Sequence, residues 1–167
     1  MPAQPLSTEA VDEVLDLVAS FMEETLDVLD VDPDTEVDLR FEDGRVYGDL
    51  DGDEDDIALI IGRRGQTLDA VQYLVNAVVS TSVETSVHVI LDAQGYRKRR
   101  AKQLEKDADR AVQDVIDTGR RIELEPMTSS ERKVIHNYLK DHVEVATISA
   151  GREPNRRLAV EPRRDNR

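Results

Sequence analysis

Two glycines, at positions 62 and 65, interrupt a largely apolar part of this chain and restrict its fold more than any other feature. The apolar segment 57–61 (IALII) precedes the Gly-Arg-Arg-Gly sequence. After it, apolar residues recur at helical spacing, and the predicted inner face consists of Leu68, Val71, Leu74, Val75 and Val78. Because glycine has no Cβ, the backbone can turn sharply at both positions. The sequence therefore predicts two helices joined by a tight turn.

The residues around this pair predict one more helix and three strands. A helix capped by Ser or Thr is expected from about residue 8 to 29, where apolar residues recur every three or four positions. Residues 35–41 and 45–50 alternate as half-buried strands do, and the Asp-Gly dipeptide between them is a hairpin signal. Another strand is expected at 84–91. The order through residue 92 is therefore α-β-β-α-α-β.

The second half of the chain predicts two helices and three strands. A long helix begins in a basic cluster near residue 97 and ends before Gly119, a residue suited to the position after a helix. A strand is expected at 121–126, followed by a helix that begins at a capping-box pair, Thr128 and Glu131. Residues 143–149 and 156–162 read as two further strands, which complete a three-stranded sheet.

We therefore expect an α+β fold of two small domains. The first domain spans residues 1–92, and the second spans residues 93–162. Residues 163–167 (RRDNR) are expected to form a disordered tail.

Charge is distributed very unevenly along the chain. The formal net charge of -14 argues at first against nucleic acid as a ligand. Residues 1–56, however, contain 20 Asp and Glu but only 2 Lys and Arg, whereas residues 57–167 contain 16 and 20. A phosphate backbone responds to the local field, so the basic remainder can still bind it. The acidic first third is expected to be a solvated surface that repels RNA.

The Gly-Arg-Arg-Gly turn is the first candidate binding site. It lets a ligand approach the backbone closely, and the following helix presents free N–H groups and a positive dipole end there. Two arginines add charge at the same point. The candidate residues are Gly62, Arg63, Arg64, Gly65 and Gln66.

A second candidate site lies on the helix that begins near Thr128. Arg132 and His136 are four residues apart, so they share one face of that helix. Arginine can hold a phosphate through two hydrogen bonds, and histidine adds another donor. Lys133 and the earlier cluster of Arg97, Lys98 and Arg100 add positive charge.

The sequence resembles the Jag family, also called KhpB. Residues 56–80 (DIALIIGRRGQTLDAVQYLVNAVVS), with the α-β-β unit before them and the strand after, resemble a KH domain of bacterial (type II) topology over about residues 8–92. EPMTSSERKVIHNYL and VATISAGREPNRRLAVEP resemble the small domain named for its Arg-xxx-His pair, over about residues 96–162. The two domains in this order are the arrangement of the Jag family.

The resemblance implies single-stranded RNA as the ligand and assigns further residues. In KH domains the Gly-x-x-Gly loop clamps about four nucleotides of backbone. Ile61, Leu68, Val87 and Val89 would floor an apolar groove under the bases. In the second domain, Arg132 and His136 would face the ligand, together with Gly151, Asn155, Arg156 and Arg157.

The family also implies a biological setting. A small stand-alone KH protein and RNA linked to cell-envelope growth and division are the implied partners, and the role is that of a post-transcriptional regulator or RNA chaperone. Many members begin with an additional domain, whereas this chain starts at the KH domain, so functions of that extra domain are not expected here.

Several other function classes lack their signals. Without cysteine, neither a disulfide framework nor a thiolate zinc site is expected. No P-loop motif occurs, and the carboxylates of 51–56 do not have the spacing of an EF-hand. Six aromatic residues argue against stacking platforms, which predicts modest sequence specificity. We expect no enzyme activity, cofactor, metal ion or membrane insertion, and a cytoplasmic protein, because neither a spanning segment nor a signal peptide is recognised.

Two rival functions remain open at this stage. The acidic first helix could dock a basic partner protein, which would make the chain an interaction adaptor. Alternatively, the second domain could bind single-stranded DNA.

Overall fold

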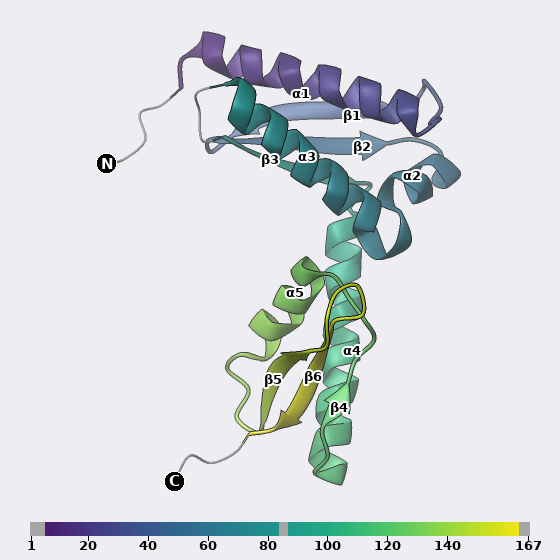
Figure 1. Ribbon diagram of the computed structural model, residues 1–167, viewed down its shortest axis with the longest axis vertical. Helices are drawn as coiled ribbons and strands as arrows, with labels where there is room; N and C mark the ends of the chain where they lie inside the picture. The colour runs from purple at the N-terminus through teal and green to yellow at the C-terminus, as the bar shows by residue number, and fades with distance from the viewer. Residues whose placement is uncertain (1–5, 84–86, 164–167) are drawn as a thin grey trace. The chain divides into compact units, whose positions relative to one another are not determined.

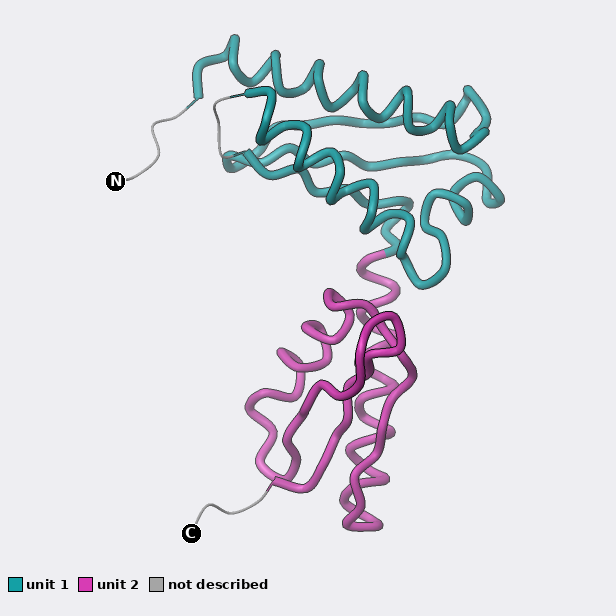
Figure 2. The backbone as a smooth tube through the Cα atoms, in the orientation of Figure 1, with its two compact units in different colours: residues 1–96 teal, residues 97–167 magenta. Residues whose placement is uncertain are grey.

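The computed structural model describes residues 6–83 and 87–163. Within these ranges the fold is α+β, with two compact units, residues 1–96 and 97–167 (Figure 2). The domain boundary expected near residue 92 stays a prediction. No helix in the described ranges combines the length and apolar character needed to cross a bilayer.

The first unit has the predicted order of elements (Figure 1). Its elements are α1 (Thr8–Val28), β1 (Glu36–Glu42), β2 (Arg45–Asp51), α2 (Glu54–Ile61), the 3₁₀ turn η1 (Arg63–Gly65), α3 (Gln66–Ser82) and β3 (His88–Ala93). β2 is the central strand, antiparallel to β1 and parallel to β3. Residues 84–86, which the sequence placed in the last strand, lie outside the described residues.

One face of this sheet is covered by α1 and α3, whose apolar residues form the core with β2 and β3 (Figure 1). Val14, Val18 and Met22 of α1 are buried against it. At the hairpin, Asp43 and Gly44 both have positive φ angles, as a two-residue turn of this type requires. The opposite face of the sheet is largely polar.

The carboxylates of segment 51–56 serve helix α2. The Asp53 side chain accepts a hydrogen bond from the backbone N–H of Asp55, and Glu54, Asp55 and Asp56 occupy the first turn. Negative charge at this end of a helix is stabilised by the free N–H groups and the dipole. Among the described residues, no cluster of three or more His, Asp or Glu side chains could hold a metal ion.

The second unit has the expected three-stranded antiparallel sheet, in the order β4-β6-β5. Its elements are α4 (Tyr96–Thr118), β4 (Ile122–Glu123), α5 (Ser129–Leu139), β5 (Val145–Ala150) and β6 (Arg157–Pro162). The core lies between α4, α5 and the sheet, and includes Leu104, Ala108, Ile135 and Leu158. Thr128 and Glu131 form the predicted capping box.

Two expectations for this unit were wrong. β4 covers only Ile122–Glu123 rather than 121–126, because Pro126 cannot donate to β6 and only isolated hydrogen bonds continue beyond Glu123. Arg163 is not part of a disordered tail: its backbone N–H donates to Glu144 O at 2.8 Å and its Nε donates to Val145 O at 3.2 Å. Residues 164–167 of that tail lie outside the described residues.

Candidate nucleic-acid interface

The Gly-Arg-Arg-Gly loop has a backbone that few residues other than glycine adopt. The φ angles are 68° at Gly62, 55° at Arg64 and 77° at Gly65. Gly62 ends α2 by donating its N–H to Ala58 O at 2.9 Å, and Gly65 precedes the first residue of α3. Positive φ angles at three of the four loop residues reverse the chain between the two helices.

Close packing excludes a side chain at both glycines. A Cβ on Gly62 would lie 2.0 Å from Thr67 Oγ1, and a Cβ on Gly65 would lie 2.8 Å from Tyr96 Cε1. The loop backbone is therefore pressed against the first turn of α3 and against Tyr96. The two glycines keep this loop thin.

The N-terminus of α3 has no side-chain cap, because its N-cap residue is Gly65. N–H groups in the first turn of a helix have no partner within the helix, and they form an anion site together with the positive dipole end. Arg63 and Gln66 are exposed beside this turn, and Arg64 is half-buried. The five loop residues are thus brought together as predicted.

The apolar groove floor expected from the sequence was wrong for three of its four residues. Leu68, Val87 and Val89 are 0%, 6% and 1% exposed, because they pack in the core of the first unit. Ile61 is half-buried. Leu74, expected on the inner face of its helix, is instead 52% exposed, as is its neighbour Tyr73 at 74%.

Arg132 is buried rather than displayed to solvent. Its side chain is 8% exposed. Nη1 donates to Met127 O at 2.7 Å, and Nη2 donates to Glu153 Oε1 at 2.8 Å. The guanidinium therefore ties α5 to the segment before it and to the loop between β5 and β6. The free, phosphate-facing arginine expected here is not what the structure shows.

Arg100 is also held within the protein. Its Nε and Nη2 lie 2.7 and 2.6 Å from Glu131 Oε1, while Glu131 Oε2 accepts the backbone N–H of Thr128 at 2.8 Å. The Glu131 side chain is only 7% exposed. This ion pair joins α4 to the start of α5. The expectation that Arg100 offers a free charge to RNA is therefore not supported, because that charge is already neutralised.

The remaining predicted residues of the second unit lie on its surface, with the exception of half-buried Arg157. His136 is exposed, and its Nδ1 lies 2.7 Å from Thr147 Oγ1 of β5. Lys133 is exposed on the same helix. Gly151, Asn155 and Arg156 form the exposed β5–β6 loop, in which Gly151 has a φ of 85°.

Arg157 and the cluster at the start of α4 differ in how much free charge they offer. Arg157 Nη1 lies 3.6 Å from Glu123 Oε2, so this charge is partly neutralised. Lys98 is exposed, whereas Arg97 is half-buried. Their contact with RNA stays a prediction.

Sequence reasoning missed the acidic partners of these arginines. Glu153 lies 21 positions after Arg132, and Glu131 lies 31 positions after Arg100. Glu131 was recognised only as a capping residue. Its sequence signal, a capping glutamate next to an arginine, does not reveal an ion pair with another helix.

The comparisons with known proteins agree with this arrangement. Residues 16–91 match the family described as KhpA/KhpB, KH domain, and residues 102–162 match the family of the Arg-xxx-His domain. The RNA-binding protein KhpB of Clostridium symbiosum is 38% identical over 152 residues, which are 91% of this chain and 68% of that protein.

Two further relatives with the same name are longer than this chain. The protein of Lactiplantibacillus plantarum is 34% identical over 160 residues, 95% of this chain and 48% of its own length. That of Bacillus subtilis is 38% identical over 109 residues, 64% of this chain and 52% of its own length. The matched part of each is about half of that protein.

Proposed function

The chain belongs to the KhpB (Jag) family, and from this premise we propose that it binds single-stranded RNA through its KH and Arg-xxx-His domains, without catalysis. The observation that supports this most strongly is the Gly62–Gly65 loop. It places an uncapped helix N-terminus, a thin backbone and the exposed Arg63 at one point. A phosphodiester group is the ligand that such a point suits.

The second domain contributes a different kind of surface. Lys133, His136 and the β5–β6 loop with Arg156 are exposed, while Arg132 holds that loop through Glu153. We therefore assign Arg132 a positioning role and the exposed side chains the contact with RNA. RNA is proposed as the ligand here rather than single-stranded DNA because the similar curated proteins are named as RNA-binding.

The cellular role follows from the family. The chain is proposed to act in the cytoplasm as a post-transcriptional regulator or RNA chaperone linked to cell-envelope growth and division. A small stand-alone KH protein is the proposed protein partner. The outer face of α3 supports such a partner, because residues 70–82 contain no charged side chain and expose Tyr73 and Leu74.

The experiment that tests the function reverses the charge at the loop. Arg63→Asp places a carboxylate beside the proposed phosphate site, so affinity for a short labelled RNA should fall at least about tenfold, about 1.4 kcal/mol. Arg45→Asp is the matched control, since Arg45 is also exposed in the first unit but lies on β2. Equal affinities of the two variants would show that the loop does not clamp RNA.

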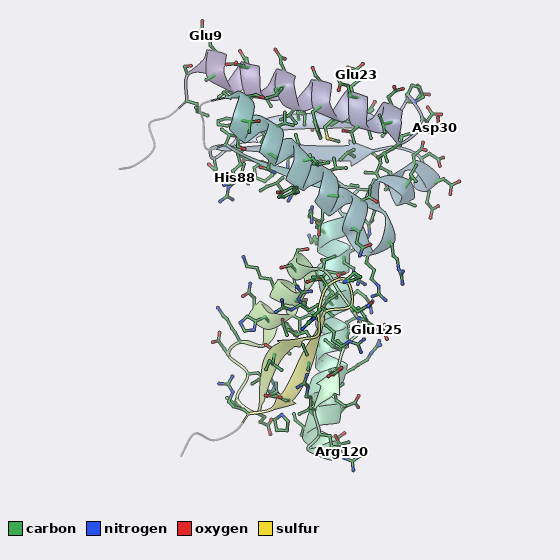
Figure 3. All side chains as sticks on the ribbon, viewed as in Figure 1. Glu9, Glu23, Asp30, His88, Arg120 and Glu125 are labelled. Carbon is green, nitrogen blue, oxygen red and sulfur yellow. The ribbon has the colours of Figure 1, made fainter. Side chains whose placement is uncertain are left out.

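The same titration separates the rival functions. Binding to DNA of the same sequence as tightly as to RNA would favour a general single-strand binder. No binding to either nucleic acid would favour an adaptor protein that uses the acidic surface of α1. In Figure 3, Glu9, Glu23 and Asp30 project from that helix away from the sheet.

A further inference from the structure

The first half of α4 bears three lysines that lie outside both sites described above. Lys98, Lys102 and Lys106 are exposed and lie four residues apart, so they are neighbours along one side of the helix, about 6 Å apart along its axis. Among the residues that the structure describes, these three side chains have no ion pair or hydrogen bond. We call them the lysine row.

The acidic residues in the same part of α4 already have partners. Asp107 accepts a hydrogen bond from Gln103 Nε2 at 3.0 Å and lies 3.6 Å from Arg110 Nη1. Asp109 accepts a hydrogen bond from Tyr138 Oη at 3.0 Å. The lysine row therefore keeps a local surplus of positive charge.

The row also faces solvent rather than the core of its own unit. The buried stripe of α4 is formed by Leu104, Ala108, Ala111, Val112 and Val115. At about 100° per residue, Lys102 and Lys106 lie on the side of the helix opposite this stripe. Their charges are thus available to a ligand.

Charge along α4 runs against the helix dipole. Its first turn has no acidic residue and its last turn no basic one. Arg97, Lys98 and Arg99 occupy the positive end instead, which weakens a helix in the absence of an anion. In the same chain, α2 follows the favourable rule with three acidic residues in its first turn. A bound anion would relieve this repulsion, so the reversal in α4 indicates an anionic ligand.

We propose that the lysine row binds successive phosphates of a single RNA strand. The inference rests on the proposed function and adds a contact surface to it. The repeat of about 6 Å suits the distance between neighbouring phosphates of an extended single strand. Lysines supply point charges without reading bases, so this contact is independent of sequence.

The test compares two variants of the full chain that lose the same charge. Lys102→Gln with Lys106→Gln removes two members of the row. Arg120→Gln with Lys140→Gln removes two exposed charges elsewhere in the same unit; Arg120 follows the end of α4 (Figure 3), and Lys140 follows α5. Binding of a short labelled oligouridine is measured at several salt concentrations.

The expected result is a specific loss in the row variant. Its affinity should fall at least about fivefold, and its plot of log K against log salt should become less steep by about 1.4, or about 0.7 for each lost phosphate contact. The control variant should stay within about twofold of the parent. Because the row is not part of the core, both variants should melt no lower than the parent.

Other outcomes would overturn the proposal in distinguishable ways. If the parent binds RNA and the row variant matches the control, the row is not a phosphate site, and the proposed function stands. If the parent fails to bind RNA, the proposed function itself is wrong. If a labelled polyglutamate peptide binds the row as tightly as oligouridine does, the row is a docking surface for acidic proteins rather than an RNA site.

Discussion

At the scale of single residues, glycines with positive φ differ in what surrounds them. Gly44 has a φ of 74° but open space where a Cβ would lie, whereas Gly62 faces Thr67 Oγ1 at 2.0 Å. Gly44→Ala should therefore lose only the cost of the left-handed conformation, about 1–2 kcal/mol. Gly62→Ala should lose about 1–3 kcal/mol more through overpacking.

Urea unfolding of the two variants measures this difference directly. A third variant, Gly65→Ala, should fall between them, since its Cβ would lie 2.8 Å from a ring atom of Tyr96. Equal losses at Gly44 and Gly62 would mean that the loop can move away from α3, and that its thinness does not depend on glycine.

The hydrogen bond from Tyr138 to Asp109 makes a prediction about pH. This bond to a carboxylate, with the negative charge of Asp109, raises the pKa of Tyr138 above its ordinary value of 10.0. The folded state therefore favours the neutral phenol. The contribution of this pair to stability is present in full below about pH 10 and is lost as the pH rises through the higher folded-state pKa.

Phenolate absorbance measures this titration. The difference between the parent and Tyr138→Phe isolates the single tyrosine, and Asp109→Asn should lower its midpoint towards the ordinary value. A midpoint that Asp109→Asn leaves unchanged would show that the hydrogen bond does not persist in solution.

At the scale of elements, side chains of α3 close the free edge of the first sheet. Asn76 Oδ1 accepts the backbone N–H of Val89 at 2.9 Å, and its Nδ2 donates to Val89 O at 2.8 Å. Gln72 Oε1 accepts the backbone N–H of Leu91 at 2.9 Å. The two amides take the place of a neighbouring strand, which protects the edge from pairing with another chain.

This arrangement predicts local effects on hydrogen exchange. Asn76→Ala should cost about 1–3 kcal/mol, because it leaves two backbone groups of Val89 without partners. The amide of Val89 should then exchange faster than that of Leu91, and Gln72→Ala should reverse the order. Asn137→Ala, at an exposed position of α5, is the control. Uniform acceleration of both amides in each variant would contradict the separate roles.

The elements themselves could be predicted because their signals are local. Apolar periodicity, the Asp-Gly hairpin and the Thr128–Glu131 capping box each lie within a few residues, and the structure has all of them. Exposure of Leu74 could not be predicted, since periodicity shows that a face is apolar but not what covers it. Burial of Arg132 depends on Glu153, and no local pattern reports a pair so far apart in sequence.

At the scale of the whole molecule, the segregated charge predicts opposite responses to salt. With a net charge of -14, concentrated as -18 in residues 1–56, the free protein repels itself. Salt screens this repulsion, so melting temperature should rise with sodium chloride. RNA affinity should instead fall, with a slope of roughly -3 to -4 in log K against log salt if about four to six phosphates are contacted.

A variant of α1 separates the two responses. Glu9→Gln with Glu23→Gln removes two exposed carboxylates that project away from the sheet (Figure 3). Less self-repulsion should make its melting temperature depend less on salt. The slope for RNA binding should stay that of the parent, because counterions are released only where cations of the protein meet phosphates. If the variant instead bound RNA more tightly at low salt, the acidic helix would lie within a screening length of the RNA path and would tune affinity directly.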